Sequence, residues 1–137
     1  MRFRGISRRL LGYSLGLSLL SIAVFGVEGR NATASAPPVV VKMVDMPASY
    51  QPAILSIKVG DTVEWKNVGN SIHHASSDPS SAINPGDVSN PPGAKPFDSG
   101  FLQPGQSFTY TFTVQGKYKY VCAPHETSGM SGEVVVK

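Results

Sequence analysis

The sequence predicts an all-β domain that follows an N-terminal segment of a different kind. Three observations support this fold class: β-branched and aromatic residues recur in short alternating runs, glycine and proline separate these runs, and no segment after residue 27 has helical periodicity. Short strands joined by such turns are typical of a β-sandwich or a small barrel. The chain of 137 residues has the length of one such domain.

The first 34 residues have the composition of an export signal. A start rich in arginine is followed by the apolar run 10–27 and then by small residues, and Ala32 and Ala34 suit cleavage near Ser35. The alternative is an uncleaved anchor helix, because the run is close to the length that spans a bilayer. We therefore expect residues 1–34 to be a signal peptide or membrane anchor. Residues 35–137 are then an exported domain, in the periplasm or an equivalent space such as the thylakoid lumen.

The positive charge of the chain belongs to this leader. The formal net charge is +3, but from residue 35 onward seven Lys stand against eight Asp and Glu. A nearly neutral domain gives no electrostatic reason to bind nucleic acid. We expect no nucleic-acid partner, a monomer, and contact with a membrane only if the leader is retained.

Strands are expected wherever the alternating or β-branched runs occur. These runs are 39–44, 53–59, 62–67, 107–114, 117–122 and 132–137, and residues 72–75 continue in an extended conformation. Gly60-Asp61 is a hairpin signal between two of the runs. Residues 46–52 contain two prolines and are expected to be a loop. The most regular run places Phe108, Tyr110 and Phe112 on one face, which predicts a half-buried strand.

Residues 122–130, Cys-Ala-Pro-His-Glu-Thr-Ser-Gly-Met, are the chemically informative stretch. Cys122 is the only cysteine, so it has no disulfide partner within the chain, and a free thiol in an oxidising compartment needs an explanation. The stretch follows a strand and gathers Cys122, His125 and Met130 in one tight loop. A fourth ligand must come from elsewhere, either His73 or His74. Only one of these two can face the site, because adjacent residues on a strand point to opposite sides.

One thiolate, two imidazoles and one thioether are the donors of a mononuclear type 1 copper site. Zinc favours more cysteine or histidine or an open water position, and iron–sulfur clusters need more thiolates. The sequence therefore predicts one copper ion per chain that cycles between Cu(II) and Cu(I) in electron transfer. The alternative is an extracytoplasmic module for copper storage, delivery or sensing. No enzyme activity is expected, because the three histidines of the chain cannot build a second copper centre.

Two motifs resemble the plastocyanin and halocyanin branch of the cupredoxins. They are Y-x-Y-x-C-x-P-H-x4-M-x-G, residues 118–132, and G-D-T-V-x-W-x-N, residues 60–67, followed by His73. The resemblance covers residues 39–137. It implies a cupredoxin-like Greek-key β-sandwich of about seven to eight strands, and type 1 copper bound by His73, Cys122, His125 and Met130.

The resemblance also implies roles for the residues around the copper. The spacing in relatives selects His73 over His74, and it implies that the backbone N–H of residue 74 donates to the cysteine sulfur. The His74 side chain departs from the usual pattern and is either a solvent-facing polar group or a pH-sensitive group beside the site. Redox protein donors and acceptors are expected to dock near the edge of His125. Val121 replaces the tyrosine that plastocyanins often use as a second electron port, which puts that port in doubt here.

Residues 76–100 are rich in proline and glycine and show no periodicity. An irregular segment of this length is uncommon in a small domain. It is either a tolerated surface insertion or part of the docking surface near His73.

Overall fold

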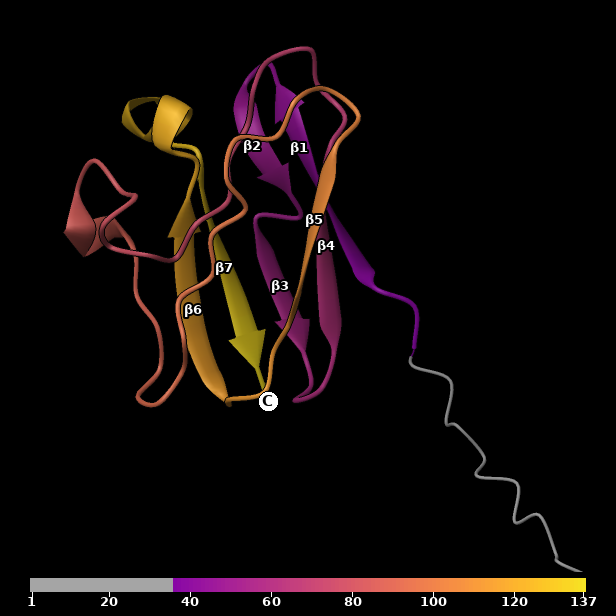
Figure 1. Ribbon diagram of the computed structural model, residues 1–137, viewed down its shortest axis with the longest axis vertical. Helices are drawn as coiled ribbons and strands as arrows, with labels where there is room; N and C mark the ends of the chain where they lie inside the picture. The colour runs from indigo at the N-terminus through magenta and orange to yellow at the C-terminus, as the bar shows by residue number, and fades with distance from the viewer. Residues whose placement is uncertain (1–35) are drawn as a thin grey trace, which may run out of the picture. The chain divides into compact units, whose positions relative to one another are not determined.

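The computed structural model describes residues 36–137, which form two β-sheets packed face to face (Figure 1). The first sheet has the strand order β2-β1-β4-β5 and the second has the order β3-β7-β6. The elements are β1 (Val39–Asp45), β2 (Ala48–Gln51), β3 (Ile54–Ile57), β4 (Thr62–Asn67), β5 (Ser107–Thr111), β6 (Gly116–Val121) and β7 (Ser131–Val136), with 3-10 helices η1 (Pro85–Asp87) and η2 (Ala123–Ser128). This confirms the predicted all-β sandwich, with seven strands.

The expected signal or anchor helix, residues 1–34, lies outside the described residues. Within residues 36–137, no helix has the length and hydropathy needed to span a bilayer.

The inner faces of the sheets carry the expected alternating residues. In β4, Val63, Trp65 and Asn67 are buried between more exposed neighbours, and in β6 Tyr118 and Tyr120 are buried. The Trp65 ring lies 5.5 Å from that of Tyr120, measured between centroids, in an edge-to-face arrangement. An aromatic core therefore joins the two sheets.

The predicted hairpin at Gly60-Asp61 is wrong. β3 pairs in parallel with β7 of the second sheet, whereas β4 belongs to the first sheet and pairs in parallel with β1. The turn signal is real, because Gly60 has a φ of 93° and the Asp61 carboxylate accepts the Lys58 N–H at 2.8 Å. A turn signal fixes where a strand ends, but it does not decide which strand the returning chain pairs with.

The expected loop over residues 46–52 is partly wrong as well. Residues 48–51 form β2, which pairs antiparallel with β1 and buries Tyr50. Pro47 and Pro52 lie just outside this edge strand, where the missing proline N–H removes no hydrogen bond from the ladder. The prolines therefore bound the strand instead of preventing it.

The irregular segment 76–100 lies along β6 (Figure 1). Ser76 exchanges backbone hydrogen bonds with Val121, and Ser89 exchanges them with Lys119, at 2.9 to 3.1 Å. The segment also places Phe97 in the core with 2 % of its surface exposed. It is therefore an integral part of the domain.

Candidate metal centre

Three of the predicted ligands lie together at one end of the sandwich. Donor atoms of His73, Cys122 and His125 all fall within 4.8 Å of one another, and they form the one close cluster of such donors found in residues 36–137. Nδ1 of His125 lies 3.4 Å from Sγ of Cys122, and Nδ1 of His73 lies 3.8 Å from it. The two imidazole nitrogens and the sulfur thus face one point.

The loop after β6 brings Met130 to the same place. Cys122 caps η2, and Gly129 ends it with a φ of 83°, a left-handed conformation that glycine adopts without strain. The chain then returns on itself, so the Cys122 N–H donates to the Met130 carbonyl and the Met130 N–H donates to the His125 carbonyl, both at 3.1 Å. Met130 is buried next to the buried Cys122.

His73 is held by the chain that leaves β4. It exchanges backbone hydrogen bonds with Leu102, at 2.8 and 3.1 Å. The buried Asn67 amide donates to the carbonyls of Ser71 and Leu102, at 2.8 and 2.9 Å. Nε2 of His73 lies 2.9 Å from Oδ1 of Asp45, which leaves Nδ1 directed toward Cys122. The donor atom of His73 is thus set by contacts on both sides of its ring.

His74 points away from this cluster, as the alternation of an extended chain requires. Its Nε2 lies 2.9 Å from Asp98 Oδ1, and its Nδ1 accepts the Ala123 N–H at 3.4 Å. Only 4 % of His74 is exposed, so the interpretation of a solvent-facing side chain is wrong. A polar residue can be buried here because both of its ring nitrogens have partners.

The Cys122 thiol lies in a low-polarity environment. Burial raises the pKa of Cys122, and hydrogen bonds from the backbone of His74 and His125 oppose this shift. The contribution of the His74 backbone agrees with the expected N–H donation to the sulfur. Because burial disfavours an isolated thiolate, a bound cation would stabilise the charged form by displacing the thiol proton.

Two aspartates support the histidines from outside the cluster. The Asn70 N–H is the main cause that lowers the pKa of Asp45 to about 2, and His73 and Ser71 add to it. At Asp98, burial raises the pKa, but hydrogen bonds from Ser81, Gly100 and His74 outweigh burial and lower the pKa to about 2. Both carboxylates are therefore anionic across the physiological range.

The cluster opens to the surface on one side. His73 and Cys122 are fully buried, whereas His125 is half-buried and its neighbour Pro124 is exposed. His125 is therefore the member of the cluster that reaches the surface.

The donor set fits a type 1 copper site. It combines one thiol sulfur and two imidazole Nδ1 atoms, with a thioether residue adjacent and no carboxylate in the close cluster. A trigonal His2Cys arrangement with a weak axial Met selects copper over zinc or magnesium. His73, Cys122 and Met130 are shielded from water by burial, and His125 alone of the four reaches the surface.

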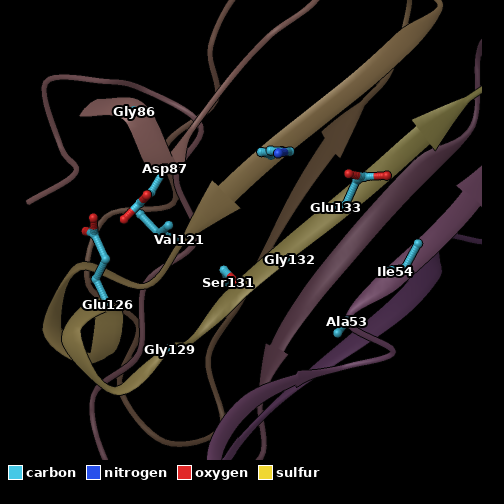
Figure 2. A pocket seen from close by; sticks show the side chains of 11 residues that line it. Ala53, Ile54, Gly86, Asp87, Val121, Glu126, Gly129, Ser131, Gly132 and Glu133 are labelled. Atoms are coloured by element: carbon cyan, nitrogen blue, oxygen red, sulfur yellow. The ribbon is translucent and has the colours of Figure 1, made fainter. Parts of the chain in front are cut away.

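A surface hollow lies elsewhere, on the outer face of β6 and β7 (Figure 2). Its carboxylates are already engaged with neighbours: Glu126 with the backbone of Ile83 and Asn84, Asp87 with the Asn84 amide, and Glu133 with Lys117. None of the three clustered donors lines it. This hollow is therefore separate from the metal centre.

Asp45 and Asp98 were not identified from the sequence as supporting residues. Each lies far along the chain from the histidine it contacts, at separations of 28 and 24 residues. No local spacing links such pairs, so their contacts depend on how the sheets pair.

Residues 38–137 match the family described as copper binding proteins, plastocyanin/azurin family. The chloroplastic plastocyanin of Hordeum vulgare is 31% identical over 140 residues, covering 99% of this chain and 87% of that protein. The chloroplastic plastocyanin of Tetradesmus obliquus is 35% identical over 88 residues, covering 64% of this chain and only 58% of that protein.

Among solved structures, the Cu(I) form of an amicyanin mutant aligns with a TM-score of 0.58 and 30% identity, covering 77% of this chain and 88% of that one. The family match and the donor cluster together confirm the predicted cofactor, one type 1 copper.

Proposed function

Since the chain belongs to the plastocyanin/azurin family of copper-binding proteins, we propose that it is an exported one-electron carrier whose copper is held by His73, Cys122, His125 and Met130. The single observation that carries the proposal is the convergence of two Nδ1 atoms on the Cys122 sulfur, at 3.4 and 3.8 Å. When bound, copper supplies the Cu(II)/Cu(I) couple.

Each residue has a defined part in this proposal. Cys122 provides the thiolate. Its binding to the metal would also explain why a cysteine without a disulfide partner is tolerated in an oxidising compartment. His73 and His125 provide neutral imidazole nitrogen through Nδ1. Met130 would offer a thioether sulfur, a weak donor of the kind that tunes the reduction potential.

The surrounding chain keeps this geometry nearly constant. His73 is fixed by Leu102 and Asp45, and the loop 122–130 is closed by its own backbone hydrogen bonds. A binding site whose ligands cannot rearrange changes little when the charge of its ion changes, and small rearrangement favours fast electron transfer. The similarity to plastocyanin and amicyanin supports the role of a carrier.

Electrons enter and leave through the edge of His125, where redox protein donors and acceptors dock. The half-exposed His125 and the exposed Pro124 support this route. A second route through the position before the cysteine is blocked, because Val121 is 1 % exposed beneath the 76–100 segment. Tyr120 lies in the core and gives no alternative surface exit.

The composition of residues 1–34 supports export. N-terminal sequencing of the protein purified from its source tests cleavage near Ser35. An intact Met1 on the mature protein would instead indicate that the leader is retained.

The absorption spectrum of the copper-loaded protein tests the electron-carrier proposal. Charge transfer from the Cys122 thiolate to Cu(II) should give an intense band at about 600 nm. Replacing Cys122 with Ser should abolish the band, whereas Ser77→Ala, a change outside the donor cluster, should leave it in place. A colourless copper-loaded wild type would refute the proposal.

A cycling experiment separates a carrier from a storage or delivery module. The carrier should return to its full band after repeated reduction and reoxidation in the presence of a copper chelator. A delivery module would lose Cu(I) to the chelator during the first cycles.

A further inference from the structure

Given the proposed function, on which this inference rests, we propose that Asp45 is a positioning residue for His73 and that its negative charge lowers the reduction potential of the copper centre. Asp45 is the last residue of β1 and lies outside the donor cluster. It acts through the imidazole of His73, so it would tune the site without contacting the ion.

The contact between the two side chains is direct. Oδ1 of Asp45 lies 2.9 Å from Nε2 of His73, a distance typical of a charge-assisted hydrogen bond. The His73 ring is completely buried, and 19 % of the Asp45 side chain is exposed. The His73 side chain has no access to water, so solvent screens its interaction with Asp45 only weakly.

Residues 69–73 surround the Asp45 carboxylate. The Asn70 N–H donates to Oδ2 at 2.6 Å, and the Ser71 N–H donates to Oδ1 at 3.2 Å. A side chain at Gly69 would collide with the Asp45 carboxylate, so glycine is needed for this close approach. Three donors and one glycine therefore hold the carboxylate in a single position.

This position determines which nitrogen of His73 is available to an ion. A carboxylate accepts hydrogen bonds and cannot donate them when ionised, so Nε2 of His73 must carry the proton. Nδ1 then has a free lone pair, and it faces the Cys122 sulfur at 3.8 Å. Asp45 thus fixes both the tautomer and the rotation of the ring, as carboxylate partners of ligating histidines commonly do.

The charge of Asp45 has a separate effect. A negative group on the far side of the imidazole raises the basicity of the ligating nitrogen and favours the more highly charged ion, Cu(II), over Cu(I). Within residues 36–137, no lysine forms an ion pair with Asp45, and His73 is its one ion-pair partner. The negative charge of Asp45 is therefore not neutralised by a lysine, and it acts on the imidazole of His73.

The test compares copper-loaded wild type with Asp45→Asn and Asp45→Ala at one fixed neutral pH. Asparagine keeps an acceptor oxygen of similar shape but removes the charge, whereas alanine removes both. The preference for Cu(II) should fall about tenfold in both variants, which is a rise of about 59 mV for a one-electron couple. Copper affinity should fall about 10- to 100-fold in Asp45→Ala and much less in Asp45→Asn.

Asp61→Asn is the matched control. Asp61 is also a turn carboxylate that accepts a backbone N–H at 2.8 Å, but it lies before β4, at the opposite end of that strand from the segment leading to His73. Its replacement changes the net charge of the protein equally. If Asp45→Asn shifts the potential no more than Asp61→Asn does, the proposed effect of charge is wrong.

A second readout uses the copper-free protein. Nitrogen-15 NMR of the side chain should show His73 protonated at Nε2, with a proton that exchanges slowly in wild type and rapidly in Asp45→Ala. Equal exchange in the two proteins would overturn the positioning role. A wild type without the visible band would instead refute the proposed function, so the two failures are distinguishable.

Discussion

His74 and Asp98 form a hydrogen-bonded pair beside the metal centre, with Nε2 of the histidine 2.9 Å from Oδ1 of the aspartate. The same carboxylate accepts the Gly100 N–H at 2.7 Å and the Ser81 hydroxyl. The other ring nitrogen of His74 accepts the Ala123 N–H. The pair therefore connects the segment 76–100 to the loop that carries three of the proposed ligands.

Replacement of His74 with Ala should leave the visible copper band in place. Neither ring nitrogen of His74 faces the donor cluster, but its removal takes one of three hydrogen-bond partners from Asp98 and the ring acceptor from the Ala123 N–H. Loss of buried hydrogen-bond partners should lower the free energy of unfolding by about 1–3 kcal/mol. Spectra and urea titrations of His74→Ala and His73→Ala check this. A band lost in the former and kept in the latter would reverse the ligand assignment.

Asp98→Asn should change how stability depends on pH. The folded pKa of Asp98 is about 2, below the ordinary value of 3.8, so the carboxylate stabilises the native state above pH 3.8 and loses this effect as the pH falls toward 2. The variant should be less stable than wild type at neutral pH and should lose less stability over that acid interval. Urea titrations of both copper-free proteins from pH 6 to about 2 measure the difference. Parallel curves would contradict this prediction.

Glu126→Gln should loosen the contact between η2 and residues 83–84, which precede η1, without affecting the copper band. The Glu126 carboxylate accepts the N–H groups of Ile83 and Asn84 at 2.8 and 2.9 Å. Glutamine has only one acceptor oxygen, so one N–H loses its partner and stability should fall by about 1 kcal/mol. Amide hydrogen exchange at residues 83 and 84 should accelerate. Glu133→Gln is the control, because the Lys117 end of its salt bridge is solvent-exposed and the pair should contribute little.

Met130→Gln should keep the visible band but lower the reduction potential. An amide oxygen is a harder and stronger axial donor than a thioether, and it stabilises Cu(II). A tenfold gain for Cu(II) would correspond to about 59 mV. Redox titration followed at the band measures the shift. A variant with an unchanged potential would indicate that Met130 does not contact the ion.

Gly132→Ala should destabilise the fold. A methyl group at this position of β7 would collide with the ring and hydroxyl of Tyr120 on β6. Overpacking of this kind costs about 1–3 kcal/mol. Thermal unfolding of Gly132→Ala and of the exposed neighbour variant Ser131→Ala measures the cost. Equal melting temperatures would show that the aromatic core can adjust.

The loop 122–130 could be predicted from the sequence because its contacts are local. Cys122, His125 and Met130 are brought together by a short 3-10 helix and one glycine turn. Both features depend on residues that are close together in the sequence. His73 could be predicted because the motif spacing and strand alternation select one of two neighbours. The alternating strands of the core were predictable for a similar reason, since period-two burial is a local pattern.

The remaining features depend on contacts between distant residues. The pairing of β3 with β7, and not with β4, follows from the packing of the whole sheet. The roles of Asp45 and Asp98 depend on chain segments that meet only after both sheets have formed. In each case the sequence shows the residue but not its partner.

The pairing of segment 76–100 with β6 also affects how copies of the protein meet. An outer strand with free N–H and C=O groups can recruit the edge of another molecule and start a growing sheet. Here Ser76 and Ser89 already occupy the outward backbone groups of Val121 and Lys119. At these two residues the edge therefore offers no free backbone groups to another molecule, which removes one route to polymerisation.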